Sequence, residues 1–171
     1  MTPKVESAFR SDLEKCVPNL LAFARSLSGN PDRANDLVQE TLVRAWINRD
    51  RFVEGTNLKA WLFTVLRNFY ISELRKRKYE VADQDGIIAA SIGAEGNQSA
   101  HMDLVDFAKA FQSLPLEQRE ALTLVGAEGF AYEEAALMCG CAVGTLKSRV
   151  NRARNRLAQL LGHDVKEAAS A

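Results

Sequence analysis

The chain has 171 residues, of which 47% are hydrophobic and 26% charged, and its formal net charge is zero. This composition is typical of a folded globular protein and excludes a disordered tail. No apolar run approaches the roughly 18 residues of a membrane-spanning helix. The first 15 residues mix charged and apolar side chains, so we expect no signal peptide and a cytoplasmic protein. The abundance of good helix formers predicts a mostly helical fold.

Three amphipathic helices are predicted in the first 80 residues, at 7–28, 31–49 and 57–79. Pro18 predicts an irregularity in the first helix because it lacks a backbone donor, and Gly29 suits the C-terminal cap. Asn30 is a favourable N-cap for the second helix, and Pro31 fits its first position. Short connections between these helices predict an all-α domain over residues 1–80.

The third helix carries more aromatic side chains than one narrow stripe can hold, namely Trp61, Phe63, Phe69 and Tyr70. It ends in four consecutive basic residues, 75–78. Exposed aromatics beside Arg67 and Asn68 would suit the stacking and holding of unpaired bases. A wide apolar face packed against other helices explains the same pattern equally well, and the sequence leaves both interpretations open.

Charge is distributed unevenly, at +4 over residues 1–80, −4 over 81–112 and zero over 113–171. Two basic regions separated by an acidic stretch favour a nucleic-acid partner despite the neutral total. Residues 81–100 show no sustained hydrophobic periodicity and are rich in Gly, Ala, Ser, Asp and Gln. We therefore predict a flexible linker over residues 81–103. Residues 163–171 are expected to form a tail.

A second helical domain is predicted over residues 104–162. Its first helix begins at Leu104, and Pro115 separates this helix from another with 118–125 at its middle. A helix at 132–139, a turn containing Gly140 and a longer helix from 143 have the spacing of a helix-turn-helix. The last helix has an apolar stripe that we expect to be buried, made of Val143, Leu146, Val150, Ala153, Leu157 and Leu160.

The face opposite this stripe is basic. Residues 143–157 contain five Lys and Arg residues and no acid, whereas a solvated helix face usually mixes both signs. Arg can read guanine and Asn can read adenine in the major groove of DNA. The candidate DNA-binding residues are Lys147, Ser148, Arg149, Asn151, Arg152 and Arg154.

No catalytic or metal site is expected. The three cysteines, Cys16, Cys139 and Cys141, cannot all pair, and two closely spaced thiols are fewer than the four ligands of structural zinc. We find no nucleophile–base pair and no phosphate-binding loop, so we predict neither an enzyme nor a cofactor. Two alternatives remain. A dimeric helix-turn-helix regulator would leave the aromatic and basic third helix unexplained, and a small DNA-modifying enzyme would need clustered carboxylates or metal ligands near the basic face, where Glu133 and Glu134 are the only adjacent acids.

Three segments carry a resemblance to a known family, namely DLVQETLVRAW (36–46), GTNLKAWLFTVLRNFYISELRKRK (55–78) and LPLEQREALTLVGAEGFAYEEAALMCGCAVGTLKSRVNRARNRL (114–157). They resemble the extracytoplasmic-function (group 4) sigma factors of bacterial RNA polymerase, and within that family the EcfG-type general stress branch. The resemblance implies a region 2 domain and a region 4 domain joined by a flexible linker. It implies an alternative sigma factor that directs promoter-specific initiation, rather than a stand-alone regulator.

The resemblance also assigns residues to partners. It implies a contact with the clamp of core RNA polymerase for Asp36, Leu37, Gln39, Glu40 and Arg44. It places Asp50, Arg51, Phe52, Trp61 and Asn68 near the −10 element, and the basic face of the last helix on the −35 element. It further implies an anti-sigma factor similar to the NepR family. We expect this inhibitor and polymerase to share Leu37, Val38 or neighbouring residues, together with part of the region 4 surface. Thr64 stands where some relatives carry a basic residue.

Overall fold

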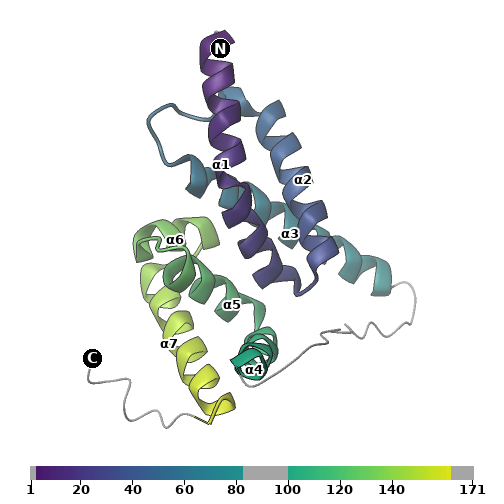
Figure 1. Ribbon diagram of the computed structural model, residues 1–171, viewed down its shortest axis with the longest axis vertical. Coiled ribbons are helices and arrows are strands. Elements are labelled where there is room, and N and C mark those ends of the chain that lie inside the picture. The colour runs from purple at the N-terminus through teal and green to yellow at the C-terminus, as the bar shows by residue number, and fades with distance from the viewer. Residues whose placement is uncertain (1–2, 83–99, 163–171) are drawn as a thin grey trace. The chain divides into compact units, whose positions relative to one another are not determined.

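The computed structural model describes residues 3–82 and 100–162, and the chain divides into two compact units, residues 1–91 and 92–171. Each unit is built of helices, and the described ranges contain no strand (Figure 1). The predicted all-α fold in two domains is therefore confirmed. Most of the predicted linker and all of the predicted tail lie outside the described residues.

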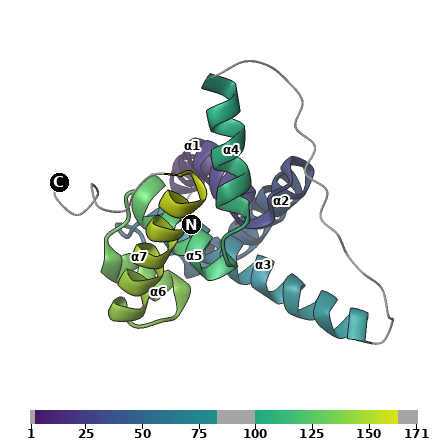
Figure 2. The same ribbon diagram turned by 90° about the horizontal axis from the view of Figure 1, so that it is seen from below.

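Unit 1 consists of three helices that all pack against one another, α1 (Pro3–Ser28), α2 (Pro31–Ile47) and α3 (Leu58–Ala82). Its core is made of fully buried apolar side chains from all three helices, among them Leu20, Phe23, Leu37, Leu62, Phe63 and Leu66. In both views α3 crosses the α1–α2 pair, and its C-terminal turns extend past α2 (Figures 1 and 2).

The helix ends follow from local chemistry. The Asn30 side chain accepts a hydrogen bond from the Arg33 N–H (2.9 Å), so the predicted N-cap of α2 is confirmed. Gly29 has a φ of +66°, the left-handed conformation expected of the residue that closes α1. α1 runs through exposed Pro18 without interruption, so the predicted irregularity is wrong. Buried Leu13 and Leu20 hold the helix against its neighbours on both sides of the proline.

Two polar contacts fix α3 to the corner between α1 and α2. The Arg33 guanidinium forms an ion pair with Glu73, and both side chains are mostly buried. The Tyr70 hydroxyl donates a hydrogen bond to the Leu27 carbonyl oxygen at 2.9 Å. These contacts hold the middle of α3, whereas the turns that follow Glu73 are increasingly exposed.

Unit 2 contains α4 (Ala100–Gln112), α5 (Leu116–Leu122), the π-helical turn η2 (Thr123–Ala127), α6 (Tyr132–Cys139) and α7 (Val143–Leu160). The Glu128 N–H donates to the Thr123 carbonyl (2.9 Å), and Phe130 then enters the core. α4 begins four residues earlier than predicted, and its side chains at Leu104 and Phe107 are exposed.

The predicted buried stripe of α7 is correct in its middle. Leu146, Val150 and Ala153 are fully buried or nearly so, and Leu157 follows them. Leu160, however, is 50% exposed, so its assignment to the core is wrong. It lies in the last turn of α7, at the end of the helix.

Candidate nucleic-acid interface

α6, a tight turn and α7 form the predicted helix-turn-helix. Gly140 caps α6 with a φ of +63°, a left-handed conformation that favours glycine. The small side chains of Ala135 and Ala136 are buried, which lets α6 and α7 pack closely. Leu146 and Val150 fill the contact from the side of α7. The turn therefore fixes the orientation of α7.

The candidate DNA-binding residues lie mostly on the outer side of α7. All of them are exposed except Arg149, which is half-buried; the exposed ones are Lys147, Ser148, Asn151, Arg152 and Arg154. The Lys147 ammonium lies 5.6 Å from the centre of the Tyr132 ring in α6. The Ser148 hydroxyl donates to the Gly144 carbonyl (3.0 Å), which leaves its oxygen able to accept from a ligand. The structure thus brings together a basic and amide-bearing surface on one helix.

The second group of predicted residues surrounds the start of α3. Asp50 and Arg51 are exposed on the short 3₁₀ helix η1 (Arg49–Arg51). Phe52 follows it and packs between Phe9 and Trp61, with ring centres 5.8 and 5.5 Å apart. The two aromatic residues predicted for the −10 element therefore belong to one packed cluster, which limits the movement of Trp61.

The base of η1 is held by Arg49, a residue that the sequence did not single out. Its guanidinium donates to the Trp46 carbonyl (2.9 Å), forms an ion pair with Glu6 (3.2 Å) and lies 5.0 Å from the Trp46 ring centre. These contacts connect η1 to both α1 and α2. Asp50 and Arg51 consequently project from an anchored turn.

The aromatic residues of α3 divide between the two interpretations that the sequence left open. Phe63 is fully buried and stacks on Phe23 (4.7 Å), and Tyr70 makes the structural hydrogen bond to Leu27. Trp61 and Phe69 are only partly buried, and Asn68 beside Phe69 is exposed. Phe63 and Tyr70 therefore belong to the packed interior of unit 1, whereas Trp61 and Phe69 line an accessible face near the Asn68 amide.

α2 carries the residues predicted to contact polymerase. Asp36 and Gln39 are exposed, and Glu40 is partly exposed. Leu37 is fully buried in the core of unit 1, so the prediction that it contacts polymerase directly is wrong, because it has no accessible surface. Val38 was expected to contact both polymerase and the anti-sigma factor, and this prediction is wrong for the same reason, since Val38 is buried.

Arg44 connects the face of α2 to α3. Its Nε lies 2.5 Å from a Glu40 carboxylate oxygen, and its guanidinium lies 4.3 Å from the centre of the Phe69 ring. A guanidinium over an aromatic face is attracted by the negative potential of the ring. Glu40, Arg44 and Phe69 therefore form a continuous chain of contacts that ends next to Asn68.

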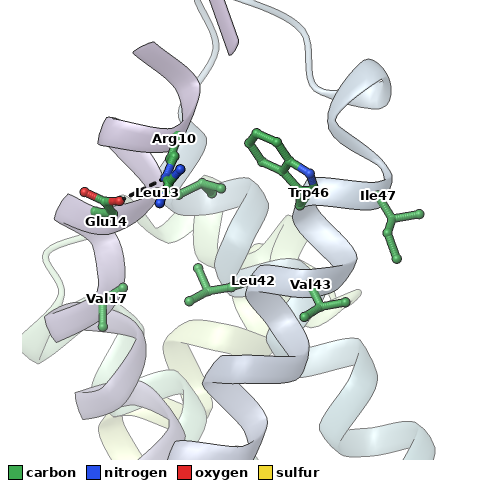
Figure 3. A pocket seen from close by; sticks show the side chains of 8 residues that line it. All are labelled: Arg10, Leu13, Glu14, Val17, Leu42, Val43, Trp46 and Ile47. Carbon is green, nitrogen blue, oxygen red and sulfur yellow. Dashed lines mark hydrogen bonds and ion pairs between the residues drawn. The ribbon is translucent and has the colours of Figure 1, made fainter. Parts of the chain in front are cut away.

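An apolar groove between α1 and α2 was not predicted from the sequence. It has a volume of about 520 Å³ and is lined mainly by Leu13, Val17, Leu42, Val43, Trp46 and Ile47, with the Arg10–Glu14 ion pair on its α1 side (Figure 3). Val43 is 53% and Ile47 67% exposed. The groove could have been found in the sequence from Val43 and Ile47, because these apolar residues are four positions apart and lie outside the buried stripe of α2.

Comparison with known proteins identifies the family. The chain matches Sigma-70 region 2 over residues 13–79 and Sigma-70, region 4 over residues 104–157. It is 58% identical over 154 residues to the ECF RNA polymerase sigma factor EcfG of Rhodopseudomonas palustris (strain TIE-1). The aligned residues make up 90% of this chain and 85% of the relative. The chain belongs to the ECF RNA polymerase sigma factors.

Other sigma factors agree with this assignment. ECF RNA polymerase sigma factor SigM of Bacillus subtilis (strain 168) is 33% identical, over 85% of this chain and 90% of the relative. Among solved structures, the sigma factor RpoE of Bartonella quintana, in complex with the anti-sigma factor NepR, superposes with a TM-score of 0.84 at 54% identity, covering 92% and 98% of the two chains.

These findings confirm the prediction of an alternative sigma factor of the EcfG type and do not favour the stand-alone regulator. Sigma factors are transcription initiation factors and are not enzymes. In residues 3–82 and 100–162, no three His, Cys, Asp or Glu side chains are grouped as metal ligands. Over the same ranges no helix is both long and apolar enough to span a membrane.

Proposed function

We propose that this sigma factor directs core RNA polymerase to the promoters of general stress genes in the cytoplasm, without catalytic activity of its own. Region 4 would read the −35 element as duplex, and region 2 would capture an unpaired base of the −10 element. The observation that carries this proposal is the acid-free, exposed face of α7 on a complete helix-turn-helix.

The spacing on α7 supports reading of the −35 element. Lys147 and Asn151 are four residues apart, as are Ser148 and Arg152, so the four side chains share one side of the helix. Asn151 and Arg152 can hydrogen-bond adenine and guanine edges, and Arg154 can reach the phosphates. Half-buried Arg149 lies at the border of this surface and suits a phosphate contact.

The −10 proposal rests on the accessible side of α3. Trp61 and Asn68 are seven residues apart, which places them on one side of the helix about 10 Å from each other. Trp61 is held by Phe52 and can serve as a fixed stacking surface, while exposed Asn68 can hydrogen-bond an extruded base. Exposed Asp50 and Arg51 on η1 complete the proposed surface.

For polymerase, the exposed residues of α2 are the proposed contact. Asp36, Gln39 and Glu40 supply polar groups, and Arg44 extends the same side of the helix. Leu37 supports this surface from within the core and does not touch the partner. We also propose that a NepR-like anti-sigma factor binds the exposed residues around Leu37, together with part of region 4, because the similar RpoE of B. quintana was solved with NepR.

A reconstituted transcription assay tests the proposed function. The full chain is added to core RNA polymerase with a stress promoter or with a promoter whose −35 and −10 elements are scrambled. We expect transcripts from the intact promoter alone. No stimulation of core polymerase on any stress promoter would refute the proposal.

Competition binding tests the proposed regulation separately. A labelled NepR-type protein is bound to the chain and titrated with core polymerase. We expect displacement, since both partners use the exposed surface of α2. Simultaneous binding without mutual weakening would exclude inhibition by occlusion.

A further inference from the structure

The short helix η1 carries Asp50 and Arg51, which are proposed to bind the −10 element, and it has no core of its own. None of the residues of η1 is buried, and residues 53–57, which follow soon after, are all exposed. Two backbone hydrogen bonds of 2.9 and 3.1 Å close the turn itself but do not connect it to the rest of unit 1. Side-chain contacts must therefore fix the position of η1.

Arg49 supplies the polar part of this attachment. One end of its guanidinium, Nη1, donates to the Trp46 carbonyl at 2.9 Å, and the other end, Nη2, lies 3.2 Å from Oε1 of Glu6 in α1. The side chains of Arg49 and Glu6 are 28% and 37% exposed, whereas those of the Lys15–Asp12 pair in α1 are 72% and 54% exposed. Water and salt screen exposed ion pairs, so the Arg49–Glu6 pair should be the stronger of the two.

The start of α1 holds η1 a second time, through aromatic contacts. Glu6 and Phe9 are three residues apart and therefore lie on one side of α1. Phe9 is buried, and its ring centre lies 6.5 Å from that of Trp46 and 5.8 Å from that of Phe52. Phe52 in turn packs against Trp61, the proposed stacking surface for an unpaired base, at 5.5 Å. The start of α1 thus reaches the −10 surface both through charge and through packing.

These two attachments contribute differently to the fold. Phe9 is part of the core, so its replacement by a smaller side chain would destabilise unit 1 as a whole. Glu6 is only partly buried, and a change of its charge leaves every core contact in place. Without the ion pair η1 would be freer to move, and it would have to be ordered when a ligand binds. Such ordering costs binding affinity.

We propose that Glu6 and Arg49 are positioning residues for capture of the −10 element. Glu6 holds the Arg49 guanidinium, and Arg49 holds η1, so that Asp50 and Arg51 meet the unpaired strand in one fixed arrangement. The inference rests on the proposed function of this surface at the −10 element. It assigns a role in promoter recognition to the start of α1, although Glu6 itself does not touch DNA.

The sign of the effect separates this proposal from a general effect of charge. Glu6 is an acid, so replacing it with Gln makes unit 1 more positive, and by charge alone this change should tighten binding to a polyanion. Loss of positioning acts in the opposite direction. Weaker capture of the −10 strand by Glu6→Gln could therefore not be attributed to net charge.

The test is a double-mutant cycle on the full chain assembled with core polymerase. It compares the wild type, Glu6→Gln, Arg49→Gln and the chain that carries both changes. Asp12→Asn is the matched control, because it removes a carboxylate from an exposed ion pair of the same helix. Affinity is measured at one salt concentration for a single-stranded −10 oligonucleotide and for a −35 duplex.

We expect Glu6→Gln to bind the −10 strand about two- to fivefold more weakly than the wild type, within the range that an ion pair near a protein surface contributes. Its binding to the −35 duplex should not change, and Asp12→Asn should weaken binding to neither template. In the Arg49→Gln background the change at Glu6 should have no further effect. Glu6 also complements the positive N-terminal end of α1, but this contribution does not involve Arg49 and cancels in the cycle.

Three results would overturn the inference. The first is equal or tighter binding of the −10 strand by Glu6→Gln. The second is a defect of the same size on the −35 duplex, because this would indicate a general loss of folded protein. The third is additivity of the two changes, because Glu6 would then act without Arg49. If the wild type does not prefer a −10 strand over a scrambled one, the proposed function of this surface is refuted instead.

Discussion

The helix-turn-helix contains one glycine in its turn and one at the start of α7, and replacing each of them by alanine should have opposite consequences. Gly140 has a φ of +63°, whereas Gly144 lies within α7, and a Cβ added at either position meets no atom within 4 Å. Neither substitution therefore has a packing cost. Both remove the same flexibility from the unfolded chain, so that contribution cancels when the two variants are compared.

The difference between the variants then isolates the native backbone conformation. A left-handed conformation costs an L-residue roughly 1–2 kcal/mol. We expect Gly140→Ala to be less stable than Gly144→Ala by about 1–2 kcal/mol, since only the alanine at position 140 must adopt the left-handed conformation.

Hydrogen–deuterium exchange of peptides from α6 and α7 measures this difference. About 1.4 kcal/mol corresponds to a tenfold change in an opening equilibrium, so these amides should exchange roughly tenfold faster in Gly140→Ala. Peptides from unit 1 serve as an internal control and should not change. Equal exchange in the two variants would show that the turn does not depend on the left-handed glycine.

Three further predictions concern single residues. Arg152→Ala should weaken binding to a −35 duplex by roughly 1–3 kcal/mol at one fixed salt concentration, because alanine cannot hydrogen-bond the base edge; wild-type affinity would contradict its assignment. Asn68→Ala should impair opening of the −10 element in a permanganate footprint while polymerase binding is retained, and normal opening would remove Asn68 from base capture. Burial, and secondarily the charge of Asp12, raises the pKa of the Cys16 thiol above its ordinary value, so alkylation of this thiol near neutral pH should be slower in the folded than in the unfolded chain, and its rate should level off at a higher pH. Rates that level off at the same pH in the folded and the unfolded chain would disprove this.

The sequence predicted those parts of the fold that local chemistry determines. Asn30, Pro31 and Gly29 define the junction between α1 and α2 through capping and backbone preferences alone, and Gly140 does the same in unit 2. Pro18 was misjudged, because tertiary packing of Leu13 and Leu20 outweighs the missing hydrogen bond. The π-helical turn after α5 has no comparable local signal.

The candidate site was predictable only in part for a related reason. Periodicity identifies the buried side of α7 and thereby its exposed basic side, but it does not report contacts between helices. The roles of Arg44 over Phe69 and of Arg49 beneath η1 depend on residues that are distant in the sequence. For Leu37 the error was of another kind. The family motif assigned this residue to the polymerase contact, although its position in the apolar stripe of α2 already indicated that it belongs to the core of unit 1.

The division of the chain into two small helical units also has a consequence for its lifetime in the cell. Within each unit, helices that are near in sequence pack together, and such folds form in microseconds to milliseconds. Units of this size bury a modest fraction of their surface and have marginal stability, so proteases act on whichever unit opens more often. A partner that binds the native form lowers the open population by mass action. A ligand of one unit therefore protects that unit alone, and a partner that holds both protects the whole chain from degradation.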